Sequence, residues 1–330
     1  MRRPDRSPRL ATLCVQGQPA ASTKDNADRA IVLTELTRIL SEQGDWHPID
    51  AILLPGGFFR LARAVGASSF PRRRELIGKE RITGSISAAL AKLDPLSPGL
   101  RLVMGVRATP RDPSESVEQV CLAFDRTGLI GAARKMFPTR GEGGRRKFMS
   151  PCIEDYRSAK RFIELPNGST ALLNACYDLF GVADVGTDTA TRRHAICRII
   201  HSRGRTKAGE EGFRAIRDEA LSDWAQLLAD RQPDVLLAAI HFFQSPGRDG
   251  YWQRHGIATA SASTNGALAL GAAHFGGCLP DSGSTLAACR VPRSHLQDGV
   301  ERQARSLAPL RTLTFEAPNG RPKPSRLSDP

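Results

Sequence analysis

Two apolar runs with an amphipathic helix between them open the chain, and this alternation restricts it to folds that layer helices on a sheet. Residues 10–16 (LATLCVQ) and 50–55 (DAILLP) are short and apolar, as buried strands are. Between them, apolar residues recur at helical spacing through residues 27–43. The sequence therefore predicts a β–α–β unit at the start of an α/β fold.

Strands are also expected in adjacent pairs. Residues 117–124 and 129–137 alternate in the manner of strands and are joined by the turn sequence DRTG. Residues 161–165 and 170–175 form a second pair across PNGS, another turn sequence. Paired strands flanked by helices favour two packed sheets with helices on their outer faces.

Further elements fill the rest of the pattern. A helix is expected over residues 85–93 and a strand over residues 100–106. Apolar residues at helical spacing also predict a helix over residues 211–231, followed by a strand at residues 234–241.

Length and composition indicate one domain. The chain has 330 residues, 40% of them hydrophobic, which suits a single large soluble core. We expect that domain to span residues 8–315, with a flexible arm at residues 1–7 and a basic insertion at about residues 183–210. Residues 316–330 are rich in Pro, Arg and Ser and are expected to form a flexible tail.

No targeting or membrane segment is recognisable in the sequence. The longest apolar stretches are too short or too interrupted by polar residues to cross a bilayer. The basic N-terminus is not followed by the apolar core of a secretory signal. We therefore expect a cytoplasmic protein.

Cysteine spacing and charge restrict the classes of site. Seven cysteines without a C-x-x-C pair argue against a disulfide scaffold and a zinc site, so no metal or cofactor is expected. The formal net charge of +13 would attract anions. Together with the GRPK sequence at residues 320–323 it leaves nucleic-acid binding as a weaker alternative, which we do not expect.

Cys176 is the candidate nucleophile. It ends the apolar run TALLNA and is followed at once by YDLFG, so a buried strand stops at a thiol and then turns. A thiol at such a sheet edge is accessible to a substrate, and nearby backbone N–H groups can face a developing oxyanion. The alternative is that Cys176 is a small buried hydrophobe.

The ordered segments resemble the nitrilase superfamily, carbon–nitrogen hydrolases whose catalytic set is a glutamate, a lysine and a cysteine. The resemblance covers roughly residues 8–315, and it implies a four-layer α-β-β-α sandwich. In chain order, the matching pieces are residues 10–16, 50–55, Arg134-Lys135 with Glu142 beyond, 175–178 (ACYD), 234–241 and 276–283.

The resemblance assigns roles to several residues. Lys135 would favour the thiolate and hold the oxyanion, with the backbone N–H of Tyr177 as a second donor. The alternative for Lys135 is a solvated charge at a strand end, and for Tyr177 simple packing of its ring. His241, at a strand end, either lines the pocket or is a structural histidine with its hydrogen bonds satisfied.

One position departs from the family's pattern. The family places its general-base glutamate directly after the proline that closes the second strand, where this chain has Gly56. Glu142 matches a second family glutamate, and it would act either as a surrogate base or as a partner that orients Lys135.

The sequence thus predicts a thiol-dependent hydrolase of a small amide, nitrile or ureido compound. The alternative is a catalytically inactive protein of the same fold that binds a ligand or partner. The resemblance also implies a homo-oligomer.

Overall fold

The structure, a computed structural model, covers the elements that surround the predicted site. It describes residues 8–16, 18–42, 48–65, 69–109, 117–135, 158–181, 226–243, 252, 256–257, 260, 264–265, 268–275, 287–289, 312–316 and 323–328. The expected arm at residues 1–7 and the basic insertion at residues 183–210 lie outside these ranges.

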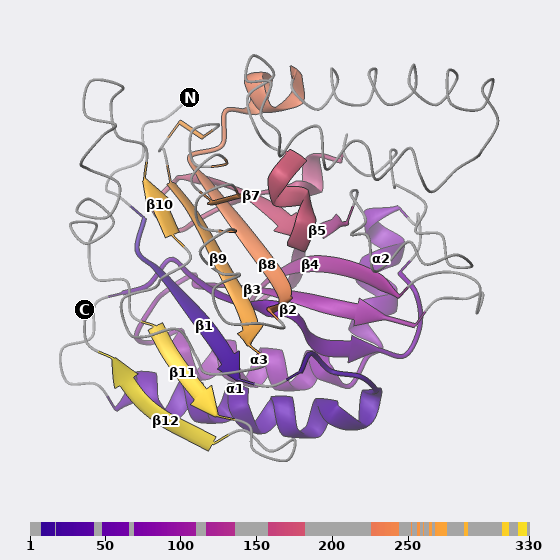
Figure 1. Ribbon diagram of the computed structural model, residues 1–330, viewed down its shortest axis with the longest axis vertical. Coiled ribbons are helices and arrows are strands. Elements are labelled where there is room, and N and C mark those ends of the chain that lie inside the picture. Colours follow the sequence, from indigo (N-terminus) through magenta and orange to yellow (C-terminus); the bar gives the residue numbers. More distant parts are fainter. Residues whose placement is uncertain are drawn as a thin grey trace.

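The described strands form one hydrogen-bonded sheet that has two halves (Figure 1). The first half comprises β1 (Leu10–Gln16), β2 (Ala51–Leu61), β3 (Arg101–Ala108), β4 (Glu118–Asp125) and β5 (Gly128–Arg134). The second half comprises β6 (Phe162–Glu164), β7 (Thr170–Ala175), β8 (Val235–Phe243) and β9 (Leu268–Phe275). The strand order is β5-β4-β3-β2-β1-β9-β8-β7-β6.

The two halves pack face to face and form two layers. Among the described strands, they meet edge to edge only where β1 pairs with β9 through Val15 and Gln16. Apolar side chains from β3 and β4 share one core with those from β7 and β8. At Gly131 of β5 an added Cβ would lie 2.5 Å from Ile163 of β6, so these strands belong to opposite layers.

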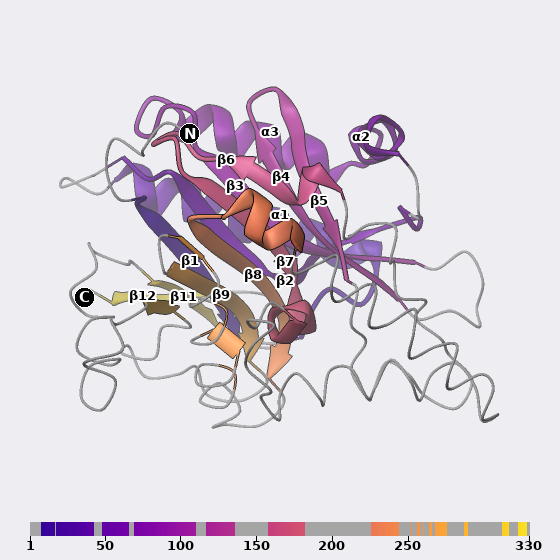
Figure 2. The same ribbon diagram turned by 90° about the horizontal axis from the view of Figure 1, so that it is seen from above.

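Helices cover the outer face of the first half. α1 (Asn26–Ser41) and α3 (Ile82–Leu93) contact each other, and α2 (Phe70–Gly78) precedes α3. Figure 2 shows α2 and α3 on one side of the strands. Leu33 and Leu36 of α1 pack in the same core as Leu54 of β2. Residues 226–231 are helical and lead into β8.

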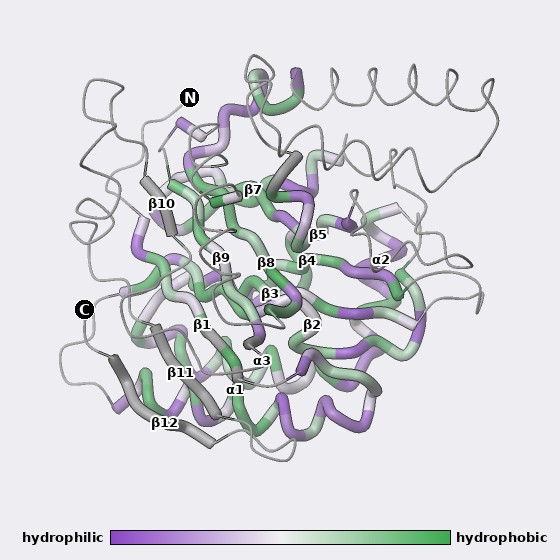
Figure 3. The backbone as a smooth tube through the Cα atoms, in the orientation of Figure 1, coloured by the Kyte–Doolittle hydropathy of each residue, from purple (hydrophilic) through white to green (hydrophobic). Residues whose placement is uncertain are grey.

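Because side chains alternate between the two faces of each strand, the first half-sheet contributes to two cores, one under the helices and one between the half-sheets. In β2, Leu53 belongs to the core between the half-sheets, whereas Leu54 belongs to the core under the helices. Successive side chains of a strand point to opposite faces, so a strand buried on both faces is apolar throughout. Figure 3 accordingly shows hydrophobic colouring along much of β8. The expected arrangement of two sheet layers flanked by helices is confirmed, with the two layers joined into one sheet.

Three elements differ from the expectations. β2 continues to Leu61, because Pro55 to Phe58 form an irregularity within the strand and do not end it. α2 was not predicted, since its sequence FPRRRELIG has few apolar residues to reveal a period. Within the expected flexible tail, β12 (Lys323–Ser328) pairs with β11 (Thr312–Glu316). β10 (Ala287–Cys289) pairs with β9.

Candidate active site

Cys176 lies at the carboxyl end of β7, where the chain changes conformation. Its φ of +54° is in the left-handed region, which a residue with a side chain rarely adopts. A short 3-10 turn, η3 (Cys176–Gly181), starts at this residue. Such strained backbone clusters at functional sites, and here it gives the sharp turn that the sequence predicted after the thiol. The residue is 5% exposed.

Lys135 directly follows β5 and is buried. Only 1% of it is exposed, and its Nζ donates a hydrogen bond of 2.9 Å to Oε1 of Gln119. Its backbone N–H also donates to the Gln119 carbonyl. The alternative of a solvated charge at a strand end is therefore wrong.

Lys135 is part of a row of polar side chains that crosses the first half-sheet. This polar row consists of Arg107 on β3, Gln119 on β4 and Lys135 directly after β5. Two residues before Arg107 lies Gly105, where an added Cβ would lie 3.0 Å from the Cβ of Ala239 in β8. Residues two apart on a strand share a face, so the polar row also faces the second half-sheet.

His241 comes from the opposite layer. It follows Ala239 by two residues in β8 and is 8% exposed. Among the described residues, neither of its ring nitrogens has a hydrogen-bond partner. Burial lowers the pKa of His241 well below its ordinary value, and the positive charges of Lys135 and Arg107 lower it further. The imidazole is therefore neutral, and within the described ranges it lacks the satisfied hydrogen bonds expected of a structural histidine.

Gly56 lies directly against this imidazole. A Cβ at position 56 would lie 2.5 Å from Nδ1 of His241 and 2.8 Å from the carbonyl oxygen of Ala239. Both separations are shorter than real Cβ contacts. The space that a glutamate side chain at position 56 would enter is thus occupied by the His241 ring and the β8 backbone.

Arg161 connects the turn after Cys176 with the strand that precedes Lys135. It ends the short 3-10 turn η2 (Ala159–Arg161) and is fully buried. Its Nη1 lies 3.9 Å from Oδ2 of buried Asp178, and its Nη2 donates a hydrogen bond to the carbonyl of Arg134. One guanidinium group thus joins a residue two positions after Cys176 to the residue directly before Lys135. Sequence reasoning missed Arg161, because a lone arginine before a strand resembles a surface residue.

Of the two remaining predicted site residues, the structure describes Tyr177 but not Glu142. The Tyr177 ring packs edge to face on Trp252 at 5.9 Å, and Trp252 makes a similar contact with Phe243 at 5.6 Å. The ring thus has a packing role, and the backbone N–H remains a predicted oxyanion donor. Glu142 lies outside the described residues.

Cys121 is the second cysteine whose side chain the structure describes. It is buried between the layers, and this burial raises the pKa of its thiol to about 12. A thiol with such a pKa is inert at neutral pH.

The described part of the chain has neither a metal-binding cluster nor a membrane-spanning helix. No group of three or more His, Cys, Asp or Glu side chains within it could hold a metal ion. No helix in that part is long and apolar enough to cross a bilayer.

Comparison with known proteins gives weak structural likenesses. No protein-family model and no curated protein matches the sequence. Among solved structures, the glutamine-dependent NAD+ synthetase of Acinetobacter baumannii is 12% identical, with a TM-score of 0.41 over 80% of this chain and 38% of that one. An N-terminal amidase with a Gln-Gly peptide is 10% identical, with a TM-score of 0.38 over 73% of this chain and 50% of that one.

A second glutamine-dependent NAD(+) synthetase, from Cytophaga hutchinsonii, is 8% identical, with a TM-score of 0.37 over 82% of this chain and 36% of that one. The chain thus spans half or less of these solved chains. Likeness at this level assigns neither an activity nor a substrate to the protein.

Proposed function

We propose that the chain is a carbon–nitrogen hydrolase that attacks a small amide, nitrile or ureido compound with the Cys176 thiolate. The observation that carries this proposal is the Arg161 bridge. Through its contacts with Asp178 and the carbonyl of Arg134, it links the turn after Cys176 to the strand end that precedes Lys135.

The chemistry follows from the pairing of a thiol and an ammonium group. Attack of the Cys176 sulfur on an amide or nitrile carbon forms a covalent thioester or thioimidate, which water then releases. The buried ammonium group of Lys135 favours the thiolate and stabilises the negative charge that develops on the attacked group. The N–H of Tyr177 would be a second donor to that charge.

Covalent labelling tests this proposal. Intact-protein mass spectrometry of the chain mixed with small amides and nitriles should detect an adduct on the wild type and none on Cys176→Ala. Lys135→Met should lower the rate of adduct formation. As the matched control, Cys121→Ala removes a buried thiol whose raised pKa makes it inert, and it should leave the adduct in place. An adduct that persists in Cys176→Ala would refute the proposal.

The second candidate is a ligand-binding protein without turnover. The observation that favours it is the absence of space for a carboxylate at Gly56. Under this candidate, iodoacetamide would alkylate Cys176 no faster than an ordinary cysteine, and none of the small compounds would be hydrolysed. Alkylation of Cys176 well above that rate favours the hydrolase.

A further inference from the structure

We infer that His241 is the general base of this site and takes the place of a carboxylate at position 56. The inference rests on the proposed function, because it assigns a step in the reaction of Cys176. It goes beyond a role for His241 in lining the pocket.

The first argument is the unsatisfied state of the ring. His241 is 8% exposed, and neither ring nitrogen has a hydrogen-bond partner within the described ranges. Buried polar side-chain atoms nearly always have a partner, and leaving one unpaired is energetically costly. A catalytic imidazole explains this cost, since its nitrogen must be free to bind the thiol proton or a water molecule.

The second argument is the position of the ring relative to the nucleophile. β7 and β8 are parallel neighbours, with Ala175 paired to Ala239. Cys176, the residue after β7, therefore lies at about the same position along the sheet as Ile240 and His241 of β8. The turn η3, which starts at Cys176, contacts β8. The thiol and the imidazole thus belong to the same end of two adjacent strands, where α/β sheets bind their ligands.

The third argument is the set of charges around the ring. Lys135 faces it from the end of β5 and Arg107 from β3, whereas β2 contributes the uncharged Gly56. From β9, His274 places its Nδ1 3.1 Å from the carbonyl oxygen of His241. The nearby cations disfavour the imidazolium, so the ring is neutral at physiological pH, which is the protonation state that a general base must have before it takes a proton.

The fourth argument is steric. The His241 ring fits against β2 because position 56 has no side chain, and any Cβ there would collide with it. The His241 ring in this position therefore requires a glycine at position 56. A chain with Gly56 has room for this imidazole and none for a carboxylate at that position.

The proposed steps conserve protons and bonds. The imidazole takes the thiol proton while the sulfur forms a bond to the amide carbon. The imidazolium then protonates the amide nitrogen as the C–N bond breaks and the amine leaves. In the second stage the imidazole takes a proton from water, the new C–O bond forms, and the C–S bond breaks. The proton returns to the thiolate.

The test uses p-nitrophenyl acetate, whose leaving group needs no protonation. Attack by Cys176 releases p-nitrophenolate and leaves an acetyl group on the sulfur, and this group is then hydrolysed. The isosteric variant His241→Gln should still become acetylated, but it should lose the acetyl group about 10²- to 10⁴-fold more slowly. Mass spectrometry would then show the acetylated protein accumulating.

The matched control is His274→Gln. His274 is the other buried histidine of the described chain, and glutamine can still donate to the His241 carbonyl. Its deacetylation rate should remain within a few-fold of the wild type. Equal deacetylation rates in His241→Gln and the wild type would overturn the inference while leaving the nucleophile in place. Failure of the wild type to acquire an acetyl group at Cys176 would instead overturn the proposed function.

If His241→Gln does not fold, the pH dependence of deacetylation in the wild type tests the inference instead. The pKa of His241 lies below its ordinary value of 6.5, so deacetylation should be independent of pH from 7 to 8.5 and should fall only in acid. A rate that rises in proportion to hydroxide across the range from 7 to 8.5 would show that no neutral imidazole acts as base.

Discussion

Arg161 shows how one buried residue can connect two segments of the candidate site that lie far apart in sequence. Its guanidinium is fully buried between the carboxylate of Asp178, two residues after Cys176, and the backbone carbonyl of Arg134, the residue before Lys135. Charged groups are rarely buried this completely unless they are paired. The pairing therefore acts on both the stability of the fold and the geometry of the site.

Removing this guanidinium should be costly. Arg161→Met keeps much of the side-chain volume but removes the cation that lies 3.9 Å from the buried Asp178 carboxylate, so the free energy of unfolding should fall by about 3–5 kcal/mol. Urea denaturation followed by circular dichroism measures this loss. The control is Arg126→Met, which breaks the ion pair with Asp94 at an arginine side chain that is 61% exposed, and it should cost at most about 1 kcal/mol. Equal losses in the two variants would contradict a structural role for the buried bridge.

Cys121 should be unreactive in the folded protein. Its burial raises the pKa of the thiol to about 12, so at pH 8 the thiolate is scarce and inaccessible. Iodoacetamide treatment followed by peptide mapping should leave Cys121 unmodified in the native state and modify it fully in 8 M urea. Native-state labelling of Cys121 as rapid as that of Cys176 would mean that the interior between the layers opens readily.

At the scale of elements, the close packing of β2, β3 and β8 requires glycine. At Gly105 of β3, an added Cβ would lie 2.3 Å from the Cα of Gly56 in β2 and 3.0 Å from the Cβ of Ala239 in β8. The first of these atoms belongs to the backbone and cannot rotate away. The small residues therefore determine how near β8, with His241, comes to β2 and β3.

A pair of glycine substitutions tests this packing. Gly105→Ala should lower the free energy of unfolding by about 3 kcal/mol or more, because strands must move apart to admit the methyl group. Gly84→Ala in α3 meets no atom within 4 Å and should raise stability by about 0.5–1 kcal/mol, since alanine is the better helix former. Thermal and urea unfolding of both variants measure these changes in stability. A neutral Gly105→Ala would show that β2, β3 and β8 are more widely separated at this position.

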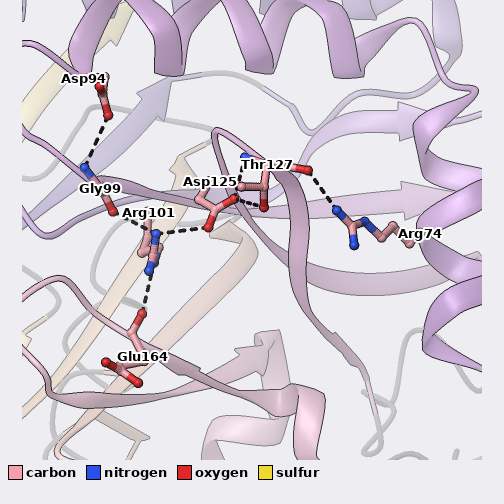
Figure 4. A network of polar contacts seen from close by, with 7 residues as sticks. All are labelled: Arg74, Asp94, Gly99, Arg101, Asp125, Thr127 and Glu164. Carbon is pink, nitrogen blue, oxygen red and sulfur yellow. Dashed lines mark hydrogen bonds and ion pairs between the residues drawn. The ribbon is translucent and has the colours of Figure 1, made fainter.

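At the scale of the whole molecule, the two half-sheets are connected by arginines at both ends. Arg161 acts at the end that carries Cys176. At the other end, Arg101 begins β3, pairs with Asp125 of the β4 end at 3.2 Å and donates to the carbonyl of Glu164 in β6 (Figure 4). The network there continues through Thr127 to Arg74 of α2. Each layer is thus tied to the other by directional contacts as well as by the shared apolar core.

Acid should destabilise the molecule through its buried histidines. Burial lowers the pKa of both His241 and His274 well below 6.5 in the folded chain, whereas the unfolded chain titrates near that ordinary value. Below about pH 6.5 the unfolded state therefore binds more protons, and the free energy of unfolding falls by up to about 1.4 kcal/mol per pH unit for each histidine.

Urea titrations at several pH values between 7.5 and 5 measure this slope. The double variant His241→Gln/His274→Gln lacks both groups and should show a smaller loss of stability over that interval. An unchanged slope in the double variant would mean that other groups cause the acid sensitivity.

The sequence by itself determined the elements whose patterns are local. The period of α1, the alternation in the hairpin of β4 and β5, and the turn sequence before β7 each specify their own structure through nearby residues. It also placed the thiol of Cys176 at the end of a strand and a lysine at the end of another.

Only the tertiary structure decided how these groups are surrounded. The burial of Lys135, the bridge made by Arg161 and the contact between Gly56 and His241 all join residues distant in sequence, across two layers. No local pattern encodes such contacts, because they depend on the separation and register of strands that meet only when the sheet folds on itself. For the same reason, Gly56 could be recognised from the sequence as a missing carboxylate, but only the folded layers show that an imidazole occupies its place.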